Sequence, residues 1–217
     1  DAVDAGKMRP LNAALTRHVC NGMDLIVTRT QAAREQLHRI GVRADIEVTT
    51  DTAFQFDRSF AAPDDMGVEV GCAPVEFHEW PVRMRLWGSR ERCYHWPYYF
   101  SWDDERARRS AGLVDAWARL ITHVVTEHDR SVRLIAMEAL DQRICRKIVA
   151  ALAPGVRNRV TEAYAGEHTP QQIVATLRSL GHLVTSRYHA CVLSMAAHVP
   201  QCAVYHDERL ESIYRDL

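Results

Sequence analysis

Residues 182–206 read HLVTSRYHACVLSMAAHVPQCAVYH, and this stretch decides the fold class. The apolar run at 182–186 predicts a buried strand, and the small apolar residues at 190–198 predict a helix. A second strand is predicted at 201–205. Strands that alternate with helices are typical of a parallel sheet, so the stretch predicts an α/β fold.

The same alternation extends towards the N-terminus of this stretch. Thr169 followed by Pro170 is typical of a helix N-cap and a first helical position. Further strands are predicted at 68–73, 132–137 and 158–163, and further helices at 104–127, 141–152, 170–180 and 207–216. We therefore predict a Rossmann-like parallel sheet with helices on both faces. The strands at 132–137, 158–163, 182–186 and 201–205 should be adjacent in it.

A second, shorter alternation lies nearer the N-terminus. Residues 24–29 and 46–50 predict strands, and 30–40 predicts a helix that Gly41 is placed to end. The polar, proline-containing connection at 57–66, DRSFAAPDDM, is typical of a hinge. Because the sequence starts with Asp rather than Met, we expect a processed chain or a piece of a longer protein.

The composition restricts the possible partners. With 47% hydrophobic and 25% charged residues the chain is globular, and its formal net charge of -1 argues against nucleic acid as a partner. No apolar run approaches the length of a membrane span. Only Lys7 and Lys147 are lysines among the 27 lysines and arginines. Arginine suits bidentate binding of phosphate and carboxylate, although a GC-rich genome would produce the same bias.

Six cysteines occur without a CxxC pair, at positions 20, 72, 93, 145, 191 and 202. Most lie in apolar helical or strand-like runs, so we expect reduced, mostly buried thiols, no disulfide and a cytoplasmic location. We also expect no metal and no cofactor. One group of possible ligands matches no zinc-binding spacing: His78, Glu79, Cys93 and His95.

Parallel sheets bind ligands outside the carboxyl ends of their strands. Function is therefore sought at the residues that end or follow the predicted strands, namely Arg29, Asp51, Pro74, Glu138, Ala163, Arg187 and His206.

The turn Arg187-Tyr188-His189 is the most informative of these positions. Side chains two apart in an extended stretch point the same way, so Arg187 and His189 are expected to converge on one ligand. The amides at the beginning of the next helix, predicted near Ala190, would add the positive end of a dipole. This arrangement predicts a site for a small dianion. In the structural alternative, which stays open, Arg187 pairs with a carboxylate from a neighbouring loop and His189 caps the helix.

The segment 77–102 is rich in aromatic residues interleaved with arginines, and it shows no clear period. Aromatic faces stack on sugars, so the segment suits an acceptor-binding loop. A lid packed over the core and a subunit contact are equal alternatives, and an oligomer is compatible with the sequence.

Three segments together resemble the polysaccharide pyruvyl transferase family. SRYHA at 186–190 is similar to the family's S-R-x-H-A segment between an apolar strand and a small-residue helix. Residues 24–56 resemble its "vRd…S…L…lGv…v…DpaF" stretch. More loosely, LIAMEALDQRICRKIVAAL at 134–152 matches the place where the family has a strand, a polar turn with an Asp, and a helix. The segments cover roughly half the chain in the family's order.

The resemblance implies part of a glycosyltransferase-B-like two-domain architecture. Residues 1–57 would be the last βαβ portion of an N-terminal Rossmann-like domain, 58–66 the hinge, and 67–217 the C-terminal Rossmann-like domain. The family's glycine-rich N-terminal stretch has no counterpart here. Thr30 stands where the family commonly has Asp, and Thr52 where it commonly has Pro.

The resemblance also implies an enzyme. Such a transferase uses phosphoenolpyruvate to place a pyruvyl ketal on a sugar of a cell-surface polysaccharide or its lipid-linked precursor. Arg187 would hold the donor's phosphate or carboxylate, next to Ser186 and Tyr188. His189 would bind the phosphate or act as the general acid.

Roles for other residues stay open in the sequence. Glu138 and Asp141 are local candidates for the general base that deprotonates the acceptor, although Asp141 could simply cap a helix. Arg29 would either reach the substrate cleft or be structural, and for Asp51 we favour a structural role that braces the hinge.

Two other functions are compatible with the same residues. One is a nucleotide-sugar glycosyltransferase of the two-domain B type, in which Glu138 or Glu162 would bind the ribose. The other is a truncated, non-catalytic domain that binds a partner through its aromatic face.

Overall fold

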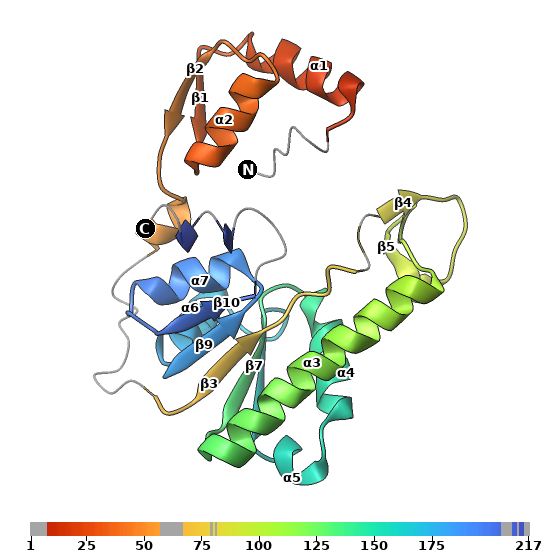
Figure 1. The fold of residues 1–217 in the computed structure, drawn as a ribbon, viewed down its shortest axis with the longest axis vertical. Coiled ribbons are helices and arrows are strands. Elements are labelled where there is room, and N and C mark those ends of the chain that lie inside the picture. The colour runs from red at the N-terminus through yellow and green to blue at the C-terminus, as the bar shows by residue number, and fades with distance from the viewer. Residues whose placement is uncertain are drawn as a thin grey trace. The chain divides into compact units, whose positions relative to one another are not determined.

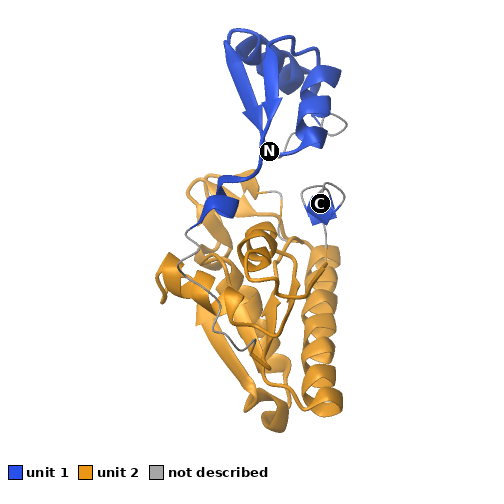
Figure 2. Cartoon of the chain, turned by 90° about the vertical axis from the view of Figure 1, so that its left-hand side faces the viewer, with its two compact units in different colours: residues 1–58, 205–217 blue, residues 59–204 orange. Residues whose placement is uncertain are grey.

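The computed structural model describes residues 8–56, 67–78, 80, 82–204, 210–211 and 213–214. The chain divides into two compact units, residues 59–204 and residues 1–58 with 205–217 (Figure 2). His206, the predicted hinge at 58–66, Glu79 and most of the helix predicted at 207–216 lie outside the described residues.

The larger unit is built on a five-stranded sheet in which every pairing is parallel (Figure 1). The order is β10-β9-β3-β7-β8, with bounds Gln201–Ala203, His182–Thr185, Val70–Ala73, Val132–Ala136 and Val160–Tyr164. The first strand, β3, lies in the middle. The next two strands extend the sheet on one side of it and the last two on the other, which is the strand order of a Rossmann-type fold. The predicted α/β class is therefore confirmed.

The four strands predicted to be adjacent in the sheet are not all neighbours. The strands at 132–137 and 182–186 are separated by a further strand. The central strand β3 pairs with β7 on one side and with β9 on the other, so it separates them. Sequence order suggests neighbours, but β3 is apolar and buried along its whole length, which is typical of a central strand.

Helices cover both faces of this sheet. On one face, α3 (Asp104–His128), α4 (Asp141–Ala151) and α5 (Pro154–Arg157) pack against side chains such as Leu134 and Ala136. On the other face, α6 (Pro170–Arg178) and α7 (Tyr188–Met195) pack against Ile135, Ala163 and Leu183. Alternate residues of β7 thus enter opposite layers of the core, as the period of a strand requires.

Local sequence explains where the helices begin. Thr169 is the N-cap of α6 and Pro170 its first residue, as expected from the sequence, and Gln172 completes a capping box with Thr169. Helix α7, however, begins at Tyr188, two residues earlier than predicted. The hydroxyl of Thr185 accepts a hydrogen bond from the Arg187 amide at 2.8 Å, and this turns the chain into the helix directly after the strand.

The aromatic segment forms a small antiparallel sheet that the sequence did not reveal. Its order is β4-β6-β5, with bounds Val82–Met84, Tyr98–Phe100 and Cys93–His95. Three-residue strands are too short to show a period. Arg106 of α3 donates from Nη1 to the carbonyl oxygens of His78 and Trp80, at 2.7 and 2.6 Å. This ties the chain just before the small sheet to the beginning of α3.

The described N-terminal part of the other unit is a βαβ element. Strands β1 (Leu25–Thr28) and β2 (Asp45–Val48) are parallel, and α2 (Gln31–Arg39) connects them. Thr30 caps α2 by accepting from the Ala33 amide, so a hydroxyl here does what a carboxylate would do. Gly41 has φ 89°, as a residue that ends a helix in the left-handed region should. A further helix, α1 (Pro10–Cys20), was not predicted, and none of its residues is buried.

All six cysteines are free thiols. Cys72, Cys145 and Cys191 are buried, and burial raises the pKa of the Cys72 thiol to about 12. Cys202, expected to be buried, is exposed because β10 is an edge strand of the sheet.

Among the described helices, none combines the length and the apolar character needed to cross a bilayer.

Candidate functional site

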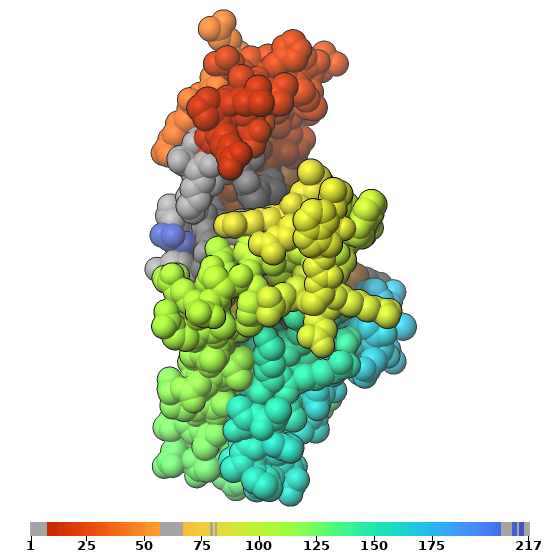
Figure 3. Space-filling model, turned by 90° about the vertical axis from the view of Figure 1, so that its right-hand side faces the viewer, coloured from red at the N-terminus to blue at the C-terminus, as the bar shows by residue number. Residues whose placement is uncertain are grey.

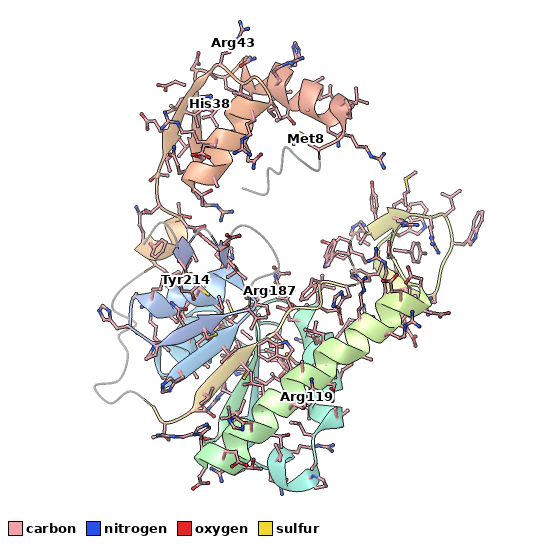
Figure 4. The ribbon with its side chains drawn as sticks, viewed as in Figure 1. Met8, His38, Arg43, Arg119, Arg187 and Tyr214 are labelled. Carbon is pink, nitrogen blue, oxygen red and sulfur yellow. The ribbon has the colours of Figure 1, made fainter. Side chains whose placement is uncertain are left out.

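The strand order reverses at one point of the large sheet, between β3 and β9. Chain connections leave this point in opposite directions, and open parallel sheets bind their ligands at such a point, outside the carboxyl ends of the strands. Thr185 closes β9 and donates from its hydroxyl to the Ala73 carbonyl oxygen at the end of β3, at 3.1 Å. Ser186 and Arg187 follow at once, so the sequence places its most informative residues at the switch point (Figure 4).

The guanidinium of Arg187 binds two carboxylates from the turn after β7. Its Nε and Nη2 donate to Oδ2 and Oδ1 of Asp141 at 2.8 and 2.5 Å, which is a bidentate fork. Its Nη1 and Nη2 donate to Oε1 and Oε2 of Glu138 at 3.1 and 3.3 Å. The pairing considered as the structural alternative is therefore present, and Glu138, Asp141 and Arg187 form one cluster.

The two carboxylates of this cluster differ in exposure. The Asp141 side chain is 2% exposed and also accepts from the Glu138 amide at 3.2 Å, whereas the Glu138 side chain is 58% exposed. One edge of the Arg187 guanidinium is thus fixed from inside the protein. The other edge is held by a group that solvent reaches.

Electrostatics hold Arg187 in its charged form. Burial lowers the pKa of its guanidinium, but the hydrogen bonds and charges of Asp141 and Glu138 outweigh burial, and the pKa is raised. Burial also raises the pKa of the Asp141 carboxyl, and the bonds from Arg187 work against that rise. Arg187 therefore favours the ionised form of Asp141 against the effect of burial.

His189 does not follow the geometry expected from an extended turn. Arg187 is extended, with φ -105° and ψ 121°, but Tyr188 and His189 already belong to α7. The rule that side chains two apart point the same way therefore ends at Arg187. His189 is exposed on the first turn of α7, where its ring packs edge-on against the Tyr188 ring, with centroids 5.4 Å apart.

Two buried hydroxyl groups lack a hydrogen-bond partner within the described part of the chain: those of Ser186 and Tyr164. Ser186 is 1% exposed and stands at the switch point itself. An unpaired buried hydroxyl costs roughly 1–3 kcal/mol. A ligand oxygen that reached Ser186 would recover this cost. Tyr164 closes β8; sequence reasoning named its neighbour Ala163 because it placed the end of the strand one residue early.

Arg29 and Asp51 form a separate cluster within the N-terminal unit. Arg29 follows β1, and its Nη1 donates to Oδ2 of Asp51, which is 3% exposed. The other oxygen of Asp51 accepts from the Ala53 amide at 2.8 Å and begins a short 3-10 helix, Thr52–Gln55. These contacts favour the structural role for both residues.

We expect Arg29→Gln to lower the free energy of unfolding by about 1–3 kcal/mol, because it removes the guanidinium charge that pairs with the buried Asp51 carboxylate. Chemical denaturation measures this change. Arg39→Gln is the matched control, since its ion pair with Glu35 is exposed, and its effect should stay within about 0.5 kcal/mol. An Arg29→Gln variant with unchanged stability and a raised KM for the donor would instead place Arg29 in a substrate site.

The fold and the switch-point residues define a class: an α/β protein with an arginine, paired with two carboxylates, at the carboxyl edge of a parallel sheet. The sequence profile of the polysaccharide pyruvyl transferase family matches residues 7–208, and the chain belongs to this family. No curated protein matches the chain. Family membership indicates a transferase with polysaccharide pyruvyl transferase activity, which requires a saccharide acceptor.

Proposed function

We propose that the chain transfers a pyruvyl group from phosphoenolpyruvate to a sugar of a cell-surface polysaccharide or its lipid-linked precursor, with Arg187 as the donor-binding residue. The observation that carries the proposal is the Arg187 guanidinium at the switch point, fixed on one edge by buried Asp141 and covered on the other by exposed Glu138. Phosphoenolpyruvate carries a carboxylate and a phosphate, and either group matches the exposed edge of a guanidinium fork.

In this proposal Glu138 occupies the position of the donor anion when no donor is bound. The bonds from Arg187 to Glu138, at 3.1 and 3.3 Å, are longer than those to Asp141. Glu138 is also the carboxylate that solvent reaches. An incoming dianion would displace Glu138 and leave the Asp141 fork in place. The released Glu138 carboxylate would then be a local acceptor for the proton of a sugar hydroxyl.

The reaction needs a proton at the donor's methylene carbon. In our proposal His189 supplies it, the C2 carbon becomes electron-poor, and a sugar hydroxyl forms the new C–O bond there as its proton passes to Glu138. The C–O bond to phosphate breaks with its electron pair. A second sugar hydroxyl then forms the second C–O bond at C2 and closes the ketal, and its proton leaves on the phosphate as hydrogen phosphate. The Ser186 hydroxyl and the first turn of α7 would contact the anionic groups.

Phosphoenolpyruvate should raise the melting temperature of the purified protein. When an acceptor saccharide is added, phosphate should be released from phosphoenolpyruvate.

Glu138→Gln removes the carboxylate that competes for Arg187, so the Kd of the variant for phosphoenolpyruvate should fall by about tenfold, the effect of one exposed charge-assisted bond. Thermal shift measures the melting temperature, and calorimetric titration measures the Kd for phosphoenolpyruvate. Because Glu138 is also a candidate base, the variant should lose turnover while it gains donor affinity. Stabilisation by nucleoside diphosphates and not by phosphoenolpyruvate would support a nucleotide-sugar glycosyltransferase in place of this function.

A further inference from the structure

The small sheet β4-β6-β5 and its connections expose an unusual number of large apolar side chains. Trp87 is 79% exposed, Met84 69%, Leu86 68% and Trp96 64%. Figure 3 shows side chains of this segment, in yellow, protruding from the face of the molecule seen there. Exposed apolar side chains that lie together mark a surface that a membrane or another molecule covers.

Packing of the small sheet accounts for its other face, not for this one. Tyr99 and Phe100 of β6 are buried, and the Trp80 ring meets the Phe100 ring edge-on with centroids 5.6 Å apart. A Cβ at Gly88 would come within 2.5 Å of the Tyr99 ring, so only glycine lets this connection lie so close to the sheet. The inner face of the small sheet is thus already filled by its own side chains. The apolar residues on its outer face therefore have no space in the interior to occupy.

Positive charge accompanies the apolar residues. Between positions 82 and 102 the chain has four arginines, Arg83, Arg85, Arg90 and Arg92, all exposed, against the single acid Glu91. The chain as a whole has 27 lysines and arginines and 28 acids, so the charge is concentrated here. Acidic residues resume only at Asp103, where α3 is capped.

A pocket of about 330 Å³ opens within the same surface. Arg85, Arg92, Tyr99 and Trp102 are among its lining residues, and the Arg92 guanidinium lies 5.1 Å from the centroid of the Trp102 ring. Glu91 also lines it, so two arginines face one carboxylate, and a volume of this size with a net positive lining suits a phosphate-bearing headgroup.

We propose that residues 82–102 form a docking surface for a bilayer that contains anionic lipids. Tryptophan prefers the interface between headgroups and acyl chains, and exposed arginines are drawn to anionic lipid. Leu86 and Met84 distinguish this surface from a sugar-binding one, because sugars stack on flat aromatic faces while aliphatic side chains gain from entering the acyl region. The inference does not depend on the identity of the donor, and a lipid-linked acceptor would be presented at the same surface.

Vesicle flotation tests the proposal with the whole chain. Wild-type protein should float with phosphatidylcholine vesicles that contain phosphatidylglycerol, float much less with phosphatidylcholine alone, and be released by salt. Arg83→Gln with Arg90→Gln should weaken binding on the order of 30-fold, at about fivefold for each arginine near the surface. Trp87→Ser with Trp96→Ser should weaken it by at least tenfold, because two interfacial anchors are lost.

The matched control is Arg119→Gln with Arg130→Gln, which removes two exposed arginines elsewhere in the same unit and should leave flotation unchanged. All these positions are exposed, so melting temperatures should stay close to wild type. Equal binding to both vesicle types, or equal loss in the control variant, would overturn the proposal. Two other results would also overturn it. In one, the protein does not bind vesicles but a soluble saccharide quenches the tryptophan fluorescence of this surface. In the other, the protein does not bind vesicles but the same variants abolish a dimer. Turnover of a short soluble acceptor should be unchanged in the surface variants, which separates this inference from the proposed function.

Discussion

Arg187→Ala should lower kcat/KM for phosphoenolpyruvate by about 10²- to 10⁴-fold, mainly through a higher KM. Each charge-assisted bond of a guanidinium to an anion contributes on the order of 1.5–3 kcal/mol, and a bidentate fork makes two. Steady-state kinetics of phosphate release measure the loss. Arg187→Lys should recover only part of it, because an ammonium group cannot reproduce the planar fork.

The structure supplies a control for the folding effect of this substitution. Arg187→Ala leaves the Asp141 carboxylate buried and without its partner, which should cost about 3–5 kcal/mol of stability. Adding Asp141→Asn removes the second charge and should recover much of the stability but none of the donor affinity. If the double variant regains both, Arg187 acts only as a structural partner of Asp141. If both variants keep wild-type kinetics, the site assignment is wrong.

The second large effect concerns His189. His189→Ala should lower kcat for phosphate release by about 10²- to 10⁴-fold with little change in KM, which is the usual contribution of a positioned acid. Histidine suits the role because it is the side chain that changes protonation near neutral pH, and His189 is solvent-exposed beside the switch point.

His189→Gln keeps hydrogen-bonding capacity without the transferable proton, so it separates the two roles considered for this residue. A variant that retains turnover but binds the donor poorly would assign His189 to phosphate binding. If His189 is the general acid, kcat of the wild-type protein should fall at higher pH. This fall should be absent from the pH profiles of both variants. Because His189 is exposed, neither substitution should affect folding, and melting temperatures check this directly.

The sequence predicted the layout of the larger unit well because its elements are long enough to show a period. Helix α3 and strands β7 and β9 were placed within one residue at each end. The place of β3 in the middle of the sheet could not be read in the same way, since strand order depends on packing between distant segments. The antiparallel sheet of the aromatic segment also escaped prediction, because strands of three residues carry too few alternations.

The candidate site shows the same division. SRYHA, at the end of an apolar strand, was enough to locate Arg187 at the carboxyl edge of the sheet. Its partners were predicted only as an unspecified carboxylate from a neighbouring loop, because Glu138 and Asp141 reach Arg187 from a turn more than forty positions away in sequence. The expected convergence of His189 with Arg187 rested on an extended backbone, and this premise is wrong because His189 belongs to α7. The role of Thr185, whose hydroxyl begins the helix early, was not predicted. The only signal for it in the sequence is a hydroxyl residue two positions before Arg187.

The central position of β3 also affects the order in which the protein can fold. One flank of this strand is completed by β9, and Thr185 bonds Ala73 across 112 positions of sequence. While the chain is being synthesised, β3 emerges before β9, so one side of a fully apolar strand stays uncovered until residues 182–185 have been made. Folding of the sheet is therefore coupled to the synthesis of β9, and products that end before β9 should associate with one another or with chaperones through that open edge.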